Sequence, residues 1–134
     1  MPGRSAACER LWSRLVAYSL SYPEAWEDHP WEETVAKVRT KIFVFFGSDP
    51  AVRCLGLTVK VPDSAPVLVG EPFASPAGYN LGKSGWVSLR FDRVADVPMD
   101  LLEELIDESY RAVAPKRLVA QLDARADDAG RPAP

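Results

Sequence analysis

A polar turn and the strand that follows it carry the side chains best suited to bind a ligand. Residues 79–91 read YNLGKSGWVSLRF, in which Lys83 lies in a glycine-broken turn before an expected strand. Alternate side chains of a strand point to opposite faces, so Trp86, Ser88 and Arg90 would share one face. A cation can neutralise a backbone phosphate, and an aromatic ring can stack on a base. The stretch therefore indicates binding rather than a reaction.

Further basic residues are predicted on the same surface. Lys37, Arg39 and Lys60 each fall opposite the best core residues of their own strand. Together with Trp86 and Arg90 they would form a polar, basic sheet face that contains one large aromatic residue. The alternative is that Trp86 belongs to the core and the basic residues are scattered exposed charges. The sequence leaves both interpretations open.

The residues offer little for catalysis or metal binding. His29 is the single histidine, and it lies before a proline with no nucleophile motif nearby. The acidic residues between 24 and 33 are interpreted as a solvated rim, because a metal site needs ligands that converge from different elements. Gly78, Gly82 and Gly85 precede a strand instead of opening a helix, so a dinucleotide fingerprint is not supported. We therefore expect no enzymatic activity, no cofactor and no metal ion.

Length and composition predict one soluble domain. The 134 residues are 47% apolar and 10% aromatic, which is enough to form a hydrophobic core without disulfides or structural metal ions. The chain has no apolar run of about 18 residues and no signal-peptide core, so we expect a cytoplasmic protein without a membrane span. Cys8 and Cys54 are expected to be buried free thiols, because cytosolic disulfides are rare.

The charge of the chain is unevenly distributed. A net charge of −3 opposes an indiscriminate nucleic-acid binder, which is usually basic. Residues 96–110 carry six acids and no base, whereas residues 37–61 carry five bases and one acid. An acidic balance can therefore coexist with one basic face.

The hydrophobic pattern predicts the elements that position these residues. Apolar residues at helical spacing predict helices, alternating or continuous apolar runs predict strands, and prolines mark the loops. The expected order is a helix over 6–20, a loop over 21–31, strands over 35–39, 41–46 and 55–61, a short helical turn over 65–69, a strand over 86–91, a helix from Pro98 and a helix over 116–124. The nearly all-apolar 41–46 segment is typical of a strand covered on both faces. The fold class is α+β, with helices packed on one face of an antiparallel sheet and the other face free. One domain would span residues 1–126, and residues 127–134 would form a flexible tail.

Four segments together resemble the MmcQ/YjbR family. They are YPEAWEDHPW at 22–31, KVRTKIFVF at 37–45, YNLGKSGWV at 79–87 and LIDESYRAV at 105–113. The resemblance covers about residues 6–120 in order. It implies a CyaY-like α+β fold, a double-wing arrangement and DNA binding.

The central turn departs from the family pattern. In many members it reads Tyr-His-Met-Asn-Lys-x-His-Trp, whereas here Asn80, Leu81, Gly82 and Gly85 replace the His, Met, Asn and second His. Any role of those histidines is not carried over. The resemblance implies roles for the matching residues Lys83 and Trp86, and also for Lys41.

Two functions of different classes follow. The first is a non-enzymatic DNA-binding protein that contacts nucleic acid through Lys37, Arg39, Lys41, Lys60, Lys83, Trp86 and Arg90. The alternative is a module that binds a small aromatic molecule or a protein partner, with ligand contacts at Trp26, Trp31, Tyr79 and Trp86. Either would be a monomer or a weak dimer.

Overall fold

The fold combines a single sheet with helices from both ends of the chain. The computed structural model describes residues 5–30, 33–47, 52–78 and 81–130, with side chains through Arg125. The helices are α1 (Ala6–Leu20), α2 (Ala65–Leu68), α3 (Met99–Val113) and α4 (Lys116–Gly130), with 3₁₀ turns η2 (Leu81–Ser84) and η3 (Val94–Asp96). The strands are β1 (Ala25–Asp28), β2 (Thr34–Val38), β3 (Lys41–Phe46), β4 (Leu55–Lys60), β5 (Ala74–Pro76) and β6 (Trp86–Phe91).

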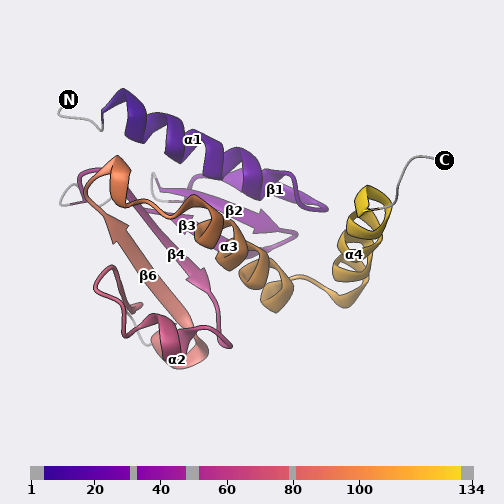
Figure 1. The fold of residues 1–134 in the computed structure, drawn as a ribbon. Coiled ribbons are helices and arrows are strands. Elements are labelled where there is room, and N and C mark those ends of the chain that lie inside the picture. The colour runs from indigo at the N-terminus through magenta and orange to yellow at the C-terminus, as the bar shows by residue number, and fades with distance from the viewer. Residues whose placement is uncertain (1–4, 31–32, 48–51, 79–80, 131–134) are drawn as a thin grey trace.

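The six strands form an antiparallel sheet in the order β1-β2-β3-β4-β6-β5. Helices α1 and α3 lie side by side across one face of this sheet, and α4 follows beyond the C-terminal end of α3 (Figure 1). The predicted fold class, an α+β antiparallel sheet with helices on one face, is confirmed. Strands β2 and β3 form an antiparallel hairpin.

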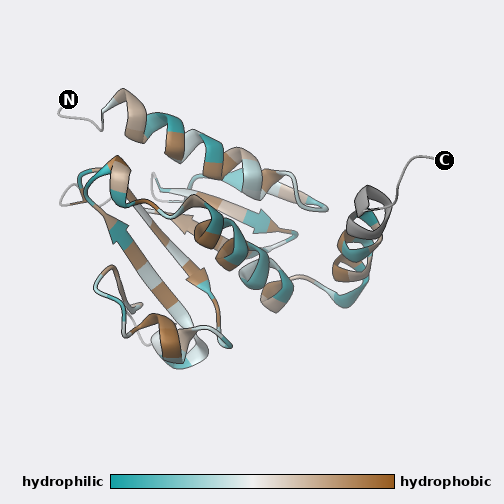
Figure 2. Cartoon of the chain, in the orientation of Figure 1, coloured by the Kyte–Doolittle hydropathy of each residue, from teal (hydrophilic) through white to brown (hydrophobic). Residues whose placement is uncertain are grey.

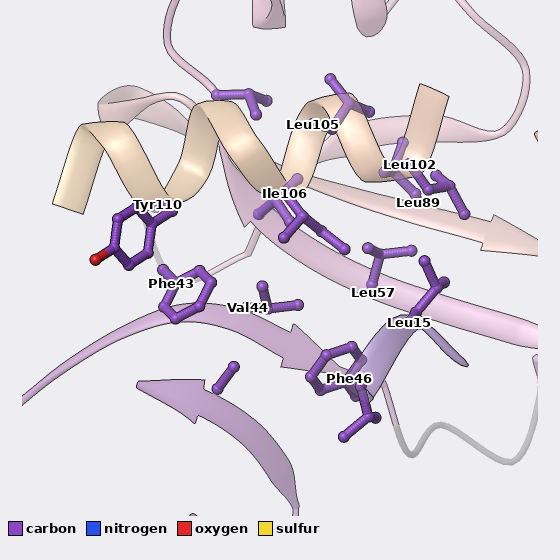
Figure 3. Packing of buried hydrophobic residues seen from close by; sticks show 14 of the residues in the cluster. Leu15, Phe43, Val44, Phe46, Leu57, Leu89, Leu102, Leu105, Ile106 and Tyr110 are labelled. Carbon is purple, nitrogen blue, oxygen red and sulfur yellow. The ribbon is translucent and has the colours of Figure 1, made fainter. Parts of the chain in front are cut away.

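The core lies between the two helices and the sheet. Leu15 of α1 and Ile106 of α3 meet Leu57 and Leu89 of the central strands, and all four are almost completely buried (Figure 3). Both helices carry hydrophilic and hydrophobic residues, as amphipathic helices do (Figure 2). Ser5 caps the N-terminus of α1, because its hydroxyl accepts the backbone N–H of Cys8 at 3.2 Å.

A bulge in β3 changes which of its side chains reach the core. Ala36 pairs with Val44 and Lys37 with Ile42, so Phe43 is an extra residue opposite β2. A bulge of this kind lets two successive side chains turn to one face. Phe43 and Val44 are both fully buried, and the rings of Phe43 and Tyr110 lie 5.2 Å apart beneath α3 (Figure 3).

Three elements differ from the prediction. Residues 25–28, expected in a loop, form β1, and the proline-rich segment contains β5. Both are short edge strands with few buried residues, so they carry almost no periodic signal. Helix α4 continues to Gly130, which places residues 127–130 of the expected tail in a helix. Residues 131–134 lie outside the described residues.

The two cysteines form a disulfide, so the expectation of free thiols was wrong. Cys8 at the start of α1 and Cys54 before β4 are bonded, with their Cα atoms 5.1 Å apart. Both are buried, as expected. Sequence spacing cannot reveal such a pair, because 46 positions separate the two residues and only the packing of α1 on the sheet brings them together. The cytoplasmic location remains a prediction.

Candidate nucleic-acid interface

The sheet face that α1 and α3 leave uncovered gathers residues of β4 and β6. Trp86 lies opposite Lys60, and Thr58 lies opposite Ser88, with 2.9 Å between the two hydroxyl oxygens. Directly opposite residues of antiparallel strands share a face. The intervening residues of β6 are buried in the core, so Trp86, Ser88 and Arg90 lie on the other face, as predicted. We call this surface the open face.

Two aromatic rings meet on the open face. The ring of Phe45 on β3 and the indole of Trp86 on β6 lie 5.5 Å apart in an edge-to-face arrangement, and both side chains are half-buried. Phe45 pairs with Thr58, so the two rings lie diagonally across β4. Trp86 is therefore neither a core residue nor fully exposed. Val35 of β2 pairs with Phe45 on this face, and its side chain is fully buried.

The role of Phe45 was missed because the sequence pattern of β3 misleads. A run of five apolar residues after Lys41 predicts a strand covered on both faces. The bulge instead sends Phe43 and Val44 to the helices and leaves Ile42 and Phe45 half-exposed on the open face. No periodic rule predicts where a bulge will fall.

The outer edge of the open face holds a second aromatic–cation pair. Trp26 on β1 is 43% exposed, and its indole N–H donates to the Arg39 carbonyl at 2.7 Å. The ammonium group of Lys37 lies 5.1 Å from the Trp26 ring and 2.7 Å from the Asp28 carboxylate. The hydrogen bond from Lys37, with a second from the His29 backbone N–H, lowers the pKa of Asp28 below its ordinary value. The charge of Lys37 is thus partly compensated within the fold.

Two predicted cations lie at the β2–β3 hairpin. Arg39 comes after the last residue of β2, adopts a left-handed φ of 56° and pairs with Glu24 at 3.4 Å. The structure therefore places it in a turn, and not on the strand face where it was predicted. Lys41 begins β3 and is exposed. Of the predicted cations, Lys60 and Arg90 share the open face with Lys37.

The turn before β6 positions Lys83 beside this face. Lys83 lies in η2 and is exposed, two residues before Gly85. Gly85 has a φ of 88°. A Cβ atom added at this position would lie only 2.6 Å from the Cα of Pro62. The Gly85 carbonyl accepts the N–H of Val61 at 2.8 Å, which joins the turn to the end of β4. A glycine is thus required where the chain makes this close approach.

An acidic groove lies on the helix layer. A groove of about 450 Å³ is lined by one tyrosine and four acidic side chains: Tyr18, Asp100, Glu103, Glu104 and Asp107. Beside it the Tyr22 hydroxyl donates to Asp107 at 2.8 Å and lies 3.0 Å from the Tyr18 hydroxyl. Burial, reinforced by these two hydrogen bonds, raises the pKa of Tyr22. The sequence had indicated only a solvated acidic side of the helix.

Other site classes find no support in the described part of the chain. Among the described residues, no group of three or more His, Cys, Asp or Glu side chains is arranged to hold a metal ion. Within those same residues, no helix is long and apolar enough to cross a membrane. Trp31 and Tyr79, two of the four ligand contacts predicted for a small aromatic molecule, lie outside the described residues.

The other two predicted ligand contacts, Trp26 and Trp86, do not converge. They lie on β1 and β6, which are four strand spacings apart in the sheet order. At about 4.8 Å per spacing, their backbones are separated by about 19 Å. One small aromatic molecule cannot bridge that distance.

A known protein family matches the chain over most of its length. The YjbR family model covers residues 20–112, a segment that runs from the end of α1 to α3. The chain belongs to the YjbR family. No curated protein sequence matches it.

A solved structure agrees with this family assignment. The fold is similar to the crystal structure of Deinococcus radiodurans protein DR2400, which contains a DUF419 domain, with a TM-score of 0.62 and 27% sequence identity. The match covers 84% of this chain and 80% of that one. The α+β architecture described above is therefore shared with that protein.

The turn before β6 departs from the pattern that the sequence resemblance implied. Lys83 and Trp86 match the family pattern, whereas Gly85 occupies the position of its second histidine. The left-handed φ of Gly85 and its contact with Pro62 leave no room for a histidine side chain in this backbone conformation. The turn therefore offers a cation and an indole, and no imidazole, among the described residues.

Proposed function

We propose that this YjbR-family protein is a non-enzymatic DNA-binding protein. Its contact surface would be the open face together with the 79–86 turn, of which residues 81–86 are described. Lys60, Lys83 and Arg90 would contact phosphates, with Lys41 at the hairpin edge. Trp86 would lie against the nucleic acid between them.

The separation of charge between the two layers of the fold carries this proposal. Four acidic side chains line the groove on the helix layer, whereas Lys37, Lys60 and Arg90 lie on the open face. No ion pair to Lys60 or Lys83 is found among the described residues. A protein with a net charge of −3 can bind a polyanion when its positive charges gather on one face, because exposed charges farther away than about 10 Å are screened at 0.1 M salt.

The small-molecule alternative finds less support. The groove of about 450 Å³ is on the helix layer, and neither Trp26 nor Trp86, the two proposed ligand contacts that the structure describes, lines it. Its acidic lining would favour a cation over a neutral aromatic molecule. A protein-partner function has no observation of its own.

The proposal is tested by measuring how salt weakens binding. Fluorescence anisotropy with labelled duplex DNA would give the association constant at several salt concentrations. If Lys41, Lys60, Lys83 and Arg90 all contact phosphates, the slope of log K against log salt is about −3.6. The Lys60→Gln/Lys83→Gln double variant should reduce the slope by about 1.8, because each lost contact removes about 0.9.

The matched control neutralises cations away from the open face. Arg14 on α1 and Lys116 at the start of α4 are both exposed, so Arg14→Gln/Lys116→Gln removes the same net charge. Its slope should stay within error of the unmodified protein. Equal loss in both double variants would mean that only net charge matters. Absence of binding to any DNA at low salt would refute the proposed function.

A further inference from the structure

We propose that the open face binds single-stranded nucleic acid, with unpaired bases stacked on Phe45 and Trp86. This inference rests on the proposed function and narrows its substrate class. It assigns a role in binding to Phe45 of β3, an uncharged residue that the phosphate contacts of the proposed function do not involve. Single-stranded DNA and RNA share the chemistry involved, so the experiment includes both.

The geometry of the aromatic pair favours bases that are free to stack. Both rings are partly buried on a sheet surface, 5.5 Å apart, and neither projects from a helix or a long loop that could enter a groove. In a duplex the faces of the bases are covered by their neighbours, and exposing one costs a few kcal/mol. A single strand avoids this cost because its bases are already unpaired. Sheets that bind RNA use surface aromatics in this way to stack two or three bases.

The surroundings of the rings suit the backbone of a strand lying across the sheet. Lys60 lies directly opposite Trp86, so a cation adjoins the ring on the neighbouring strand. Lys83 lies three residues before Trp86, in the η2 turn that leads into β6, and it is exposed. The hydroxyls of Thr58 and Ser88 lie next to both rings and can bond the edge of a base. Stacking surface and phosphate contacts thus alternate, which is the pattern of single-strand binding proteins.

Charge confines the strand to this side of the molecule. The groove on the helix layer presents Asp100, Glu103, Glu104 and Asp107, which repel phosphates. At the β1 edge, Trp26 is 43% exposed with Lys37 over its ring, and this pair extends the aromatic and basic surface to the far edge of the sheet. The open face, about 19 Å from β1 to β6, is long enough for several nucleotides.

The test compares strands of equal length. Labelled oligo(dT), oligo(rU) and a mixed-sequence duplex, each about 15 nucleotides long, would be titrated by anisotropy at one low salt concentration. This length is within the range of single-strand binding sites. We expect at least about tenfold tighter binding of one or both single strands than of the duplex. The tighter of the two single strands identifies DNA or RNA as the source. Equal or tighter binding of the duplex would overturn the inference.

Substitutions separate stacking from apolar contact. Trp86→Leu and Phe45→Leu keep an apolar side chain on the face and remove its π surface. Because stacking contributes about 1–3 kcal/mol per base, each should weaken single-strand binding by about 5- to 150-fold while duplex binding changes little. Trp86→Phe should retain most of the affinity. Val67→Ala is the control, since Val67 is 80% exposed and belongs to α2, outside the strands that form the face.

The outcomes distinguish this inference from the proposed function. If Trp86→Leu and Phe45→Leu bind single strands as well as the unmodified protein does, while Lys60→Gln/Lys83→Gln weakens binding, stacking is refuted and the proposed function stands. If no nucleic acid binds, both fail. Far-UV circular dichroism and the thermal midpoint of each variant show whether it is folded. If Trp86→Leu fails to fold, the Phe45→Leu variant alone decides.

Discussion

Ser109 on α3 should be far more important for stability than its size suggests. Its hydroxyl accepts the backbone N–H of Lys60 at 2.8 Å and donates to the carbonyl of Phe43. Val44 pairs with Val59, so Phe43 and Lys60 would be the next pair in that register. The helix thus inserts one hydroxyl between β3 and β4 at the bulge, where the two strands no longer bond each other directly.

The cost of removing this hydroxyl follows from the two groups that it satisfies. Ser109→Ala would leave a carbonyl and an N–H without their partner in a buried place, at about 1–3 kcal/mol each. We expect the free energy of unfolding to fall by about 2–6 kcal/mol, a large part of the roughly 5–15 kcal/mol of a typical domain. Urea denaturation monitored by circular dichroism measures this change directly.

Ser19 on α1 provides a matched control. It is as fully buried as Ser109, but its hydroxyl donates only to the carbonyl of Leu15, one turn earlier in the same helix. That carbonyl already lies within the hydrogen-bond ladder of α1, so Ser19→Ala should cost less than about 1 kcal/mol. Equal losses in the two variants would refute the strand-bridging role of Ser109. A loss below about 1 kcal/mol for Ser109→Ala would do the same.

Two further predictions follow from the disulfide and from the β1 edge. The Cys8→Ala/Cys54→Ala variant should be less stable by about 4 kcal/mol, because the bond closes a loop across 46 positions. A reductant should destabilise the unmodified protein and leave the stability of the variant unchanged. Chemical denaturation measures both effects. The pKa of Asp28 is lowered by Lys37, so this carboxylate stabilises the fold above its ordinary pKa and loses that contribution as the pH falls through the lowered value. Lys37→Met should raise the pKa of Asp28 towards the ordinary value, which a carbon-detected NMR titration would reveal, and an unchanged pKa would contradict the assigned cause.

Local patterns predicted the long elements well. Helix α1 and strand β6 begin and end at the expected residues, since each combines a clear period with a boundary signal such as Ser5. Strands β1 and β5 were missed, because an edge strand buries few side chains and so needs no alternating pattern. The disulfide was missed because its two residues belong to different layers.

The candidate site was predicted in part. The alternation of β6 placed Trp86, Ser88 and Arg90 together on the side away from the core, and the same reasoning placed Lys60 beside them. The reasoning erred for Arg39, which continues the alternation of β2 in the sequence but lies in the turn.

The sequence by itself therefore determined the α+β class, the amphipathic faces of α1 and α3, and the placement of Trp86, Arg90 and Lys60 on the sheet face away from the core. Each depends on local periodicity, in which a residue and its near neighbours decide which way a side chain points. Only the tertiary structure decided that Phe45 joins Trp86, that Ser109 bridges two strands, and that the acids gather in a groove on the opposite layer. These features depend on a bulge and on contacts between residues distant in the chain, and no local pattern encodes such contacts.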